Sequence, residues 1–320
     1  MNNKLDKIYL DIIKGYSQID SKQFGSFFIK HFNNLDAAEL EQKEEEFYQE
    51  GLEKGLNVEK KQLEYLKENG IFGEEEEREI REIKNFIDNL RLSKTKVHII
   101  SLVDQLEENI KKEETKLRKK TQEKENLIGF TAEKYSTKKF NQYYIFKSIF
   151  KNKKLKEYLF NEEESNNLEE SELYELIKIY NENSVNLGER NIKKLALQPI
   201  FFNSFVLCDN NPYHFFGKPI IYLTNYQVVL FNYGCKFKNI ISESSNKIPD
   251  ELFEDPDELI KWHDASKNMQ KLIDKETKDG TTVCVVGAKN SDMQKMGIQT
   301  QTLDISKMVG KNIDEISRMH

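Results

Sequence analysis

The sequence predicts a mainly α-helical protein with a long antiparallel coiled-coil hairpin, an aromatic-rich helical core and a small β element near the C-terminus. Three observations support this fold class. Apolar residues recur three and four positions apart along most of the chain, as on one face of a helix. Hydrophobic residues make up 38% and charged residues 32% of the 320 positions, a balance typical of solvated helical proteins. One β-branched run, TTVCVVGA at 281–288, breaks the helical spacing near the C-terminus.

The charge balance and the cysteine content disfavour several classes of protein. A net charge of -6 opposes general attraction to nucleic-acid phosphates or to anionic membranes. Arginine, the residue that binds phosphate and guanine with two hydrogen bonds, is scarce. Cys208, Cys235 and Cys284 give no disulfide framework, which favours a reducing compartment. The N-terminus lacks the apolar segment of a signal peptide, and no apolar run of about 18 residues is present, so we expect no membrane contact.

Residues 1–73 are expected to form an N-terminal helical region. Leu5, Ile8 and Ile12 lie on one face of a first helix, which is predicted to end near Gly15. A second short helix, reaching residue 32, is predicted from the spacing of Phe24, Phe27, Phe28 and Phe32. Further helices are expected up to residue 73.

Residues 74–128 contain the clearest regular pattern and are predicted to form the antiparallel coiled-coil hairpin. Apolar positions alternate three and four residues apart in two arms, with a break at 93–96. These seam positions are Ile80, Ile83, Ile87 and Leu90 in the first arm and Val103, Leu106, Ile110, Leu117 and Leu127 in the second. We expect the hairpin to bury this seam against itself and to leave its tip and flanks free, so that it projects toward a partner helix.

Residues 129–160 open the predicted core domain, 129–275, with lysines interleaved with aromatic residues. Such a face can hold nucleic acid through phosphate contacts and base stacking. The residues of this candidate partner or nucleic-acid contact are Lys138, Lys139, Tyr143, Tyr144, Lys147, Lys151, Lys153 and Lys154. A helix whose aromatic side packs on the core while its lysines stay in water explains the same pattern. The acidic balance and the scarcity of arginine favour this second interpretation.

The stretch 191–241 is predicted to form the centre of the core. Helical spacing indicates two apolar faces on either side of a turn-rich connector at 209–219. The first face contains Ile192, Leu195, Pro199, Phe202 and Val206, and the second contains Tyr226, Leu230, Tyr233, Phe237 and Ile240. Pro199 is expected to kink or break its helix, because the ring removes a backbone hydrogen bond. Thr224 is a predicted N-cap, as is Asp255, which is followed by Pro256.

No pattern typical of catalysis, of a cofactor or of a metal site is present, so we expect a non-enzymatic protein that uses neither cofactor nor metal. His31 has no second ligand-type residue four positions on, which favours a partly buried histidine. Cys208 and Cys235 with His214 lack an evident fourth ligand. A third set of possible metal ligands is better explained by helix capping and by solvent exposure. It comprises Asp255, Asp257, Glu258, His263 and Asp264.

The C-terminal segment 276–320 is predicted to be a small strand–helix element. A single strand is not stable by itself, so 281–288 is expected to pair with PIIYL at 219–223 or with a partner chain. The glycine that follows the strand suggests a phosphate loop, but the Gly-Lys-Ser/Thr ending of such loops is absent.

Two stretches follow the helical N-terminus and the charged hairpin: LIGFTAEKYSTKKFNQYYIFKSIFKNKKLKEYLFNEEE at 127–164 and DNNPYHFFGKPIIYLTNYQVVLFNYGCKFKNII at 209–241. In this order the chain resembles virion and tail assembly proteins of large contractile-tailed (myovirus-type) marine phages. The resemblance implies a non-enzymatic tail or baseplate assembly factor, or a minor structural component, that acts through helical protein–protein contacts. It also implies phage tail, baseplate or head proteins as partners, in the host cytoplasm or in the virion. The alternative is a nucleic-acid-associated accessory protein that uses the face at 138–156.

Overall fold

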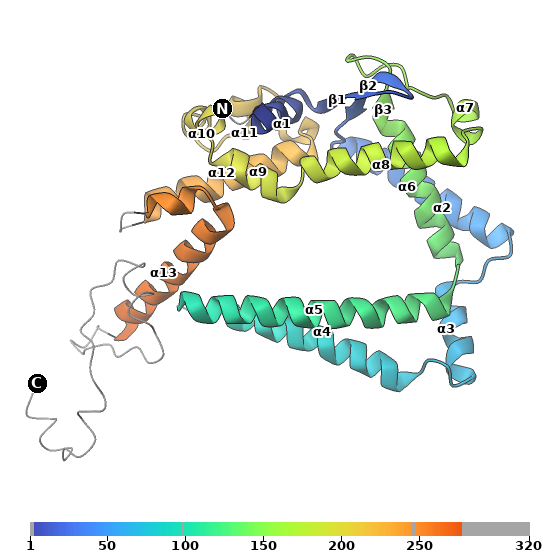
Figure 1. The fold of residues 1–320 in the computed structure, drawn as a ribbon, viewed down its shortest axis with the longest axis horizontal. Coiled ribbons are helices and arrows are strands. Elements are labelled where there is room, and N and C mark those ends of the chain that lie inside the picture. The colour runs from blue at the N-terminus through green and yellow to red at the C-terminus, as the bar shows by residue number, and fades with distance from the viewer. Residues whose placement is uncertain (1–2, 98, 245–247, 277–320) are drawn as a thin grey trace, which may run out of the picture.

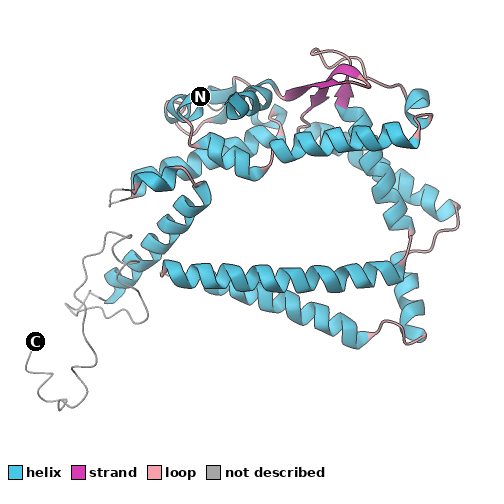
Figure 2. Ribbon diagram, viewed as in Figure 1, coloured by secondary structure: helices cyan, strands magenta, loops and turns pink. Residues whose placement is uncertain are grey.

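The structure is a computed structural model, and it describes residues 3–97, 99–244 and 248–276. The protein is mainly α-helical, as predicted (Figure 2). Its long helices are arranged as a frame in Figure 1. One side contains α8 (Glu170–Asn186), α9 (Glu189–Ala196) and α12 (Asn225–Glu243), and the opposite side is a helical hairpin. Two connecting sides are formed by α6 (Ala132–Ser148) with α2 (Asn34–Glu53) and by α13 (Pro256–Glu276).

A small antiparallel sheet lies near the N-terminus, which corrects the predicted position of the β element. Its strands β1 (Tyr16–Ser21), β2 (Gly25–Lys30) and β3 (Ile149–Phe150) are ordered β1-β2-β3. The pairs Tyr16↔Lys30 and Phe28↔Phe150 set the register. The predicted strand at 281–288 lies outside the described residues. Its proposed partner at 219–223 is not a strand, because Ile220–Tyr222 form a 3₁₀-helix after Pro219.

The β1–β2 hairpin replaces the predicted second helix, which was wrong. Helix α1 (Asn3–Lys14) ends where expected, before Gly15 at φ 79°. Gly25 at φ 69° opens β2, and glycine adopts such left-handed angles without a steric penalty. Phe27 and Ile29 then point inward with 0% and 2% exposure. This alternation of two is a strand pattern, which the helix-like spacing of the phenylalanines had obscured.

Helices α4 (Glu74–Lys94) and α5 (Ile100–Ile128) form the predicted antiparallel hairpin. Ion pairs across it join Arg91 to Glu114, Lys94 to Glu107 and Lys120 to Glu79, each at 2.7 Å. Residues further along α4 pair with residues earlier in α5, so the two arms are antiparallel. The seam is fully buried only at Ile87, Val103 and Ile110. At its end Ile128 is buried and Leu127 is 42% exposed, contrary to the predicted position.

Helix α3 (Glu59–Glu68) packs at the end of the hairpin away from its tip. Leu66 of α3, Phe72 and Ile128 form a small buried cluster, with Leu63 and Ile80 packed against it. Beside it, α2 packs closely on α6. A side chain at Gly51 would meet Tyr135 at 3.2 Å and the Ala132 backbone at 3.3 Å, so glycine permits this approach. The hairpin is therefore anchored at this end by its own chain.

The main core combines α1 with α9, α10 (Pro199–Val206), α12 and α13. Pro199 breaks the predicted helix, as expected, and it begins α10 as the first residue of a new helix. The break changes the inward face, because Phe201 and Phe205 are fully buried while Val206 is 40% exposed. Of the predicted face, Ile192 and Leu195 are buried and Phe202 is half-buried against the core. Pro199 and Val206 are exposed, contrary to the prediction.

Several predicted helix starts are confirmed. The Thr224 side chain accepts a hydrogen bond from the Gln227 backbone at the start of α12. Asp255 accepts from the backbone nitrogen of Asp257, and Pro256 is the first residue of α13. Gln227 also joins α12 to α1, because its side-chain nitrogen donates to the carbonyls of Ile12 and Ile13 at 2.8 and 3.0 Å.

The short elements complete the description. They are α7 (Glu162–Asn166), α11 (Pro212–Phe216) and the 3₁₀-helices η1 (Ile220–Tyr222) and η2 (Asp250–Phe253). Across the ranges that the structure describes, no helix has the length and apolar character needed to cross a membrane.

Candidate functional site

The candidate contact residues predicted from sequence lie on α6 and on the turn after β3. Lys138, Lys139, Tyr143, Tyr144 and Lys147 belong to α6. The other three, Lys151, Lys153 and Lys154, are exposed residues that follow β3. Lys151 pairs with Glu157 at 3.2 Å. The structure therefore brings the eight residues to one region of the chain but divides them between a helix and a turn.

The two tyrosines of this set are engaged with neighbouring aromatic rings. Tyr143 lies 5.9 Å from the Phe47 ring, and the Lys147 ammonium lies 5.2 Å from the centre of the Tyr143 ring. Tyr144 packs edge-on against Phe32 at 4.7 Å and faces Tyr180 at 6.3 Å. Burial raises the pKa of the Tyr144 hydroxyl. Stacking of a base on either ring would require these packed neighbours to move.

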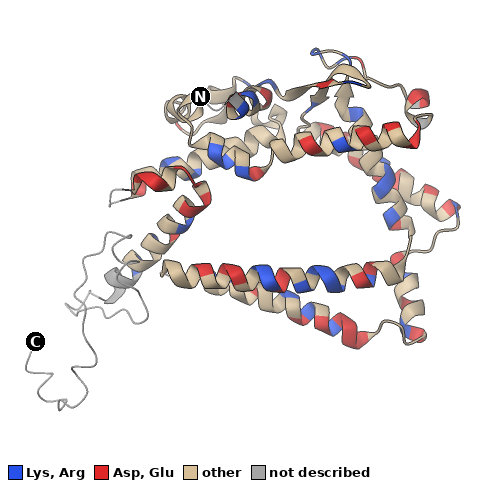
Figure 3. Ribbon diagram, in the orientation of Figure 1, with Lys and Arg blue, Asp and Glu red and all other residues tan. Residues whose placement is uncertain are grey.

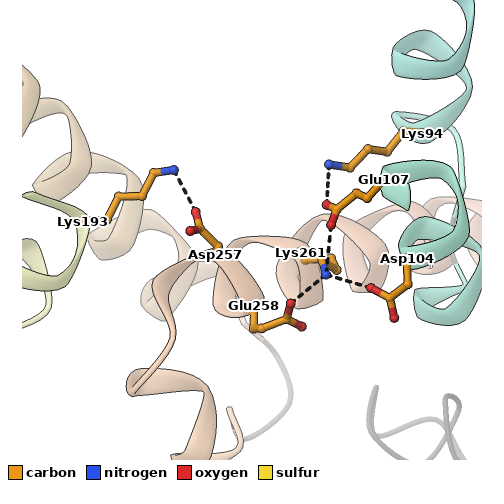
Figure 4. Close-up of polar contacts among 7 residues, drawn as sticks. All are labelled: Lys94, Asp104, Glu107, Lys193, Asp257, Glu258 and Lys261. Atoms are coloured by element: carbon orange, nitrogen blue, oxygen red, sulfur yellow. Dashed lines mark hydrogen bonds and ion pairs between the residues drawn. The ribbon is translucent and has the colours of Figure 1, made fainter. Parts of the chain in front are cut away.

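The most densely charged contact in the described residues joins the hairpin to α13 (Figure 4). The Lys261 ammonium of α13 lies 2.8 Å from Asp104 and 3.4 Å from Glu107, both on α5. It also lies 2.7 Å from Glu258, one turn earlier on its own helix. The Lys261 side chain is only 10% exposed. We call this cluster, with Lys94 of α4, the ionic joint.

The ionic joint involves both arms of the hairpin. Glu107 is shared, because Lys94 of α4 also binds it at 2.7 Å. The Asn268 side chain of α13 donates to the backbone carbonyls of Thr95 and Val97, at 2.9 and 3.2 Å. These carbonyls follow the end of α4 and have no partner within the helix. The hairpin tip, which we expected to be free, is thus bound by α13 of the same chain.

A second ion pair ties the start of α13 to α9. The Lys193 ammonium lies 2.8 Å from Asp257 and 2.9 Å from Glu189, and its side chain is 16% exposed. It also lies 5.4 Å from the centre of the Tyr233 ring, a cation–π contact. Figure 4 shows Lys193 reaching Asp257 in the first turn of α13, and Lys261 of α13 reaching Asp104 and Glu107 on α5. Helix α13 is therefore held by charge at both the core and the hairpin.

The charges in the ionic joint stabilise one another. Burial lowers the pKa of Lys261, but the hydrogen bonds to Asp104 and Glu258 and the charge of Glu107 outweigh it, and the net direction is upward. The pKa of Lys193 is also raised in net, because Asp257 and Glu189 outweigh the desolvation that lowers it. Burial raises the pKa of Glu107, while Lys94 and Lys261 lower it by more. These shifts favour the charged forms of Lys261, Lys193 and Glu107.

An open groove of about 1050 Å³ lies beside the ionic joint, between α4, α5, α9 and α13. Charged residues of both signs line it, including Lys193 and Lys261, whose ammonium groups already bind carboxylates. A ligand that used either lysine would have to displace those carboxylates. The arrangement suits a contact between helices that salt can weaken.

Two carboxylates of the charged group at 255–264, which the sequence analysis weighed as metal ligands, bind lysines instead. Asp257 binds Lys193, and Glu258 binds Lys261. His263 lies 3.7 Å from Glu243 and 3.5 Å from Asp264. In the part of the chain that the structure describes, no three residues of the types His, Cys, Asp and Glu gather around a point that would suit a metal ion.

The ionic joint was not predicted from the sequence. Only the pair of Glu258 and Lys261 is predictable from spacing, because residues three apart on a helix are neighbours. Lys261 and Asp104, however, are separated by 157 positions along the chain. In a chain with 49 basic and 55 acidic residues, no pattern selects this pair.

Replacing Lys261 with Met is expected to lower the free energy of unfolding by about 1–2 kcal/mol, because Asp104, Glu107 and Glu258 would lose their shared cation. The half-exposed carboxylates keep this cost below that of a fully buried pair. Urea denaturation at low salt measures the change. Lys112→Met on α5 is the control, because its pair with Glu108 is exposed on both sides and should contribute less than about 0.5 kcal/mol. Equal effects of the two substitutions would contradict the importance of the ionic joint.

The chain matches no model of a protein family, no curated protein and no solved structure.

Proposed function

We propose that the protein is a non-enzymatic assembly protein of a contractile-tailed phage, either a tail or baseplate assembly factor or a minor structural component. The observation that supports this proposal best is the hairpin of α4 and α5. It is anchored by α3 at one end and by α13 at the other, and its flanks are exposed between these anchors. A rigid pair of helices with free flanks suits docking of a partner helix.

The surface offered to that partner is an apolar strip on α4. Ile83 and Leu90 are only half-buried, although they belong to the seam, and Phe86 between them is 51% exposed. These three residues are spaced three and four apart, so they are neighbours on one side of the helix. Basic and acidic residues alternate along α5 beside this strip (Figure 3). A third helix with apolar residues at matching spacing would complete the burial of the seam.

The proposed partners are tail, baseplate or head proteins of the phage. Affinity purification of the tagged chain from infected cells should recover such proteins in stoichiometric amounts, at roughly 0.15 M and at roughly 0.5 M salt alike, because an apolar contact is not screened. Phe86→Glu should reduce the recovery at least about tenfold, as for an aromatic residue at the centre of an interface. Tyr174→Glu is the control, since Tyr174 is 70% exposed and lies on α8. Purification of the chain without phage proteins would contradict the proposal.

The alternative, a nucleic-acid-associated accessory protein, is supported by the exposure of Lys138, Lys153 and Lys154. It predicts retention on single-stranded DNA that weakens with salt, by roughly 0.7 log units of affinity per log unit of salt for each phosphate contact. Changing Lys138, Lys139, Lys153 and Lys154 to Glu should abolish that retention. The control changes Lys60, Lys61, Lys84 and Lys119 to Glu, which gives the same net charge elsewhere. Equal loss in both variants would show a general charge effect and reject this face as the binding site.

A further inference from the structure

The segment 195–235 is almost free of charge in a highly charged protein. Asp209 and Lys218 are its only residues of the types Asp, Glu, Lys and Arg, which make up 32% of the whole chain. The core accounts for part of this, because Phe201, Phe205 and Phe215 pack on one another inside it. The core does not account for the outward-facing part of the segment.

A large share of the outward-facing side chains in this segment is apolar. Leu207 is 84% exposed and Tyr213 is 56% exposed, at the end of α10 and in α11. In η1, Ile220 is 66% and Tyr222 is 53% exposed. We define the 206–222 surface by these side chains and their exposed neighbours, in full Val206, Leu207, Tyr213, Ile220, Ile221 and Tyr222. Monomeric proteins seldom gather so many large apolar side chains in water, and loss of charge with enrichment in aromatic residues marks the centre of protein interfaces.

The two charged residues of the segment have no ionic partner among the described residues. Lys218 is half-buried beside η1, and burial lowers the pKa of its ammonium. Asp209 is exposed in the turn after α10, where it and Asn210 adopt left-handed backbone angles, φ 51° and 55°. A half-desolvated lysine without a counter-ion is unfavourable in an isolated chain. Within residues 3–97, 99–244 and 248–276, no carboxylate forms an ion pair with Lys218.

We propose that the 206–222 surface binds a second copy of this chain in an isologous dimer, with Lys218 of each copy paired to Asp209 of the other. A two-fold axis brings residue i of one copy to residue j of the other, and j to i. A surface with one unpaired cation and one unpaired anion satisfies that rule, since two such pairs form and no charge remains unmatched. The exposed apolar side chains of the 206–222 surface would then be buried against the same surface of the other copy.

Charge complementarity favours a second copy over an unrelated partner. Residues 206–222 contain one aspartate and one lysine, so a second copy supplies a counter-charge for each. The neighbouring Lys238 ammonium already binds the Asn210 side-chain oxygen at 3.3 Å. A different protein would have to supply a carboxylate and an ammonium at matching positions on an apolar surface. This proposal is independent of the assembly role, because it concerns a different face from the hairpin strip around Phe86.

Sedimentation velocity on the 320-residue chain tests the proposal. We expect a monomer–dimer equilibrium with a dissociation constant below about 100 μM, and Leu207→Glu or Ile220→Glu should raise that constant at least about 30-fold. Val185→Glu is the matched control, since Val185 is 74% exposed on α8 and its change should alter the constant less than about twofold. Circular dichroism melting curves of all variants should match that of the unchanged chain, because each site is exposed.

Reversing the charges of Asp209 and Lys218 tests whether these two residues pair between copies of the chain. Asp209→Lys and Lys218→Asp should each weaken the dimer at least about tenfold by placing like charges opposite each other. The double variant restores both pairs across a two-fold axis, so its dissociation constant should return to within about threefold of the original value. A chain that stays monomeric at about 100 μM, a dimer insensitive to Leu207→Glu, or a double variant no better than the single ones would each overturn the proposal. A monomer that enters a complex only with phage proteins would also overturn it while leaving the assembly role intact.

Discussion

Phe205→Ala is expected to lower the free energy of unfolding by about 3–5 kcal/mol, the range for truncating a buried phenylalanine. Phe205 has no exposed surface, and its ring contacts those of Phe201, Phe215 and Phe231 at 5.2, 6.0 and 5.2 Å between centres. These neighbours belong to α10, α11 and α12, so a cavity there would weaken the packing of three helices at once. Urea denaturation followed by circular dichroism measures the loss.

The control for this prediction is Phe86→Ala, because Phe86 is 51% exposed and its truncation should cost less than about 1 kcal/mol. Gly234 provides a sharper test of the same contact. A Cβ atom at Gly234 would lie 2.7 Å from Cε2 of Phe205, so Gly234→Ala should destabilise the native chain by about 1–3 kcal/mol. In the Phe205→Ala background the same change should cost nothing. Additive effects of the two substitutions would contradict this packing.

Acidification is expected to destabilise the protein through His31 by about 3 kcal/mol between pH 6.5 and pH 4. His31 is 4% exposed, and burial lowers its pKa from 6.5 to about 4. The unfolded chain therefore binds a proton on His31 at a pH where the folded chain does not. The stability contributed by neutral His31 is complete above pH 6.5 and is lost as the pH falls toward 4.

The surroundings of His31 explain why it cannot readily accept a proton. Its Nε2 atom lies 2.9 Å from the Ser17 hydroxyl, and its ring packs edge-on against Tyr226. Its buried Nδ1 atom has no hydrogen-bond partner among the residues that the structure describes. The Asp11 carboxyl group contacts the same Ser17 hydroxyl, and burial raises its pKa. A raised carboxyl pKa acts in the opposite direction, because the folded state then gains stability as the pH falls.

Comparison with His31→Phe isolates the histidine. Phenylalanine keeps an aromatic ring against Tyr226 and does not titrate, while Asp11 and the other carboxylates remain. Urea denaturation at several pH values from 7 to 4 measures the free energy of unfolding. Over this range it should fall by about 3 kcal/mol less in the variant than in the unchanged chain. Parallel curves for the two proteins would show that His31 is protonated equally in the folded and unfolded states.

Local features of the chain were readable from the sequence because their causes act within a few residues. The three-four spacing of Ile83, Ile87 and Leu90 was sufficient to predict α4 in the hairpin. The ring of Pro199 and the hydroxyl of Thr224 determine a helix break and a helix start through their own backbone chemistry. These features need no knowledge of the rest of the fold.

The candidate contact at 138–154 could not be assigned from the sequence alone. Lysines and aromatic residues in one helix are compatible with a nucleic-acid face and with a packed face. The sequence cannot distinguish these, because the difference depends on what covers the rings. Phe32 and Phe47, the neighbours of Tyr144 and Tyr143, come from a segment about a hundred residues earlier.

By itself, then, the sequence determined the helical class, the paired helices of 74–128 and the caps and breaks of several helices. Only the tertiary structure decided that residues 16–30 form strands, that α13 holds the hairpin tip through Lys261, and which phenylalanines of α10 face inward. The physical reason is the range of the forces involved. Caps and helical periodicity are set by neighbours in the chain, whereas strand pairing, ion pairs and core packing depend on groups that meet only after the chain has folded.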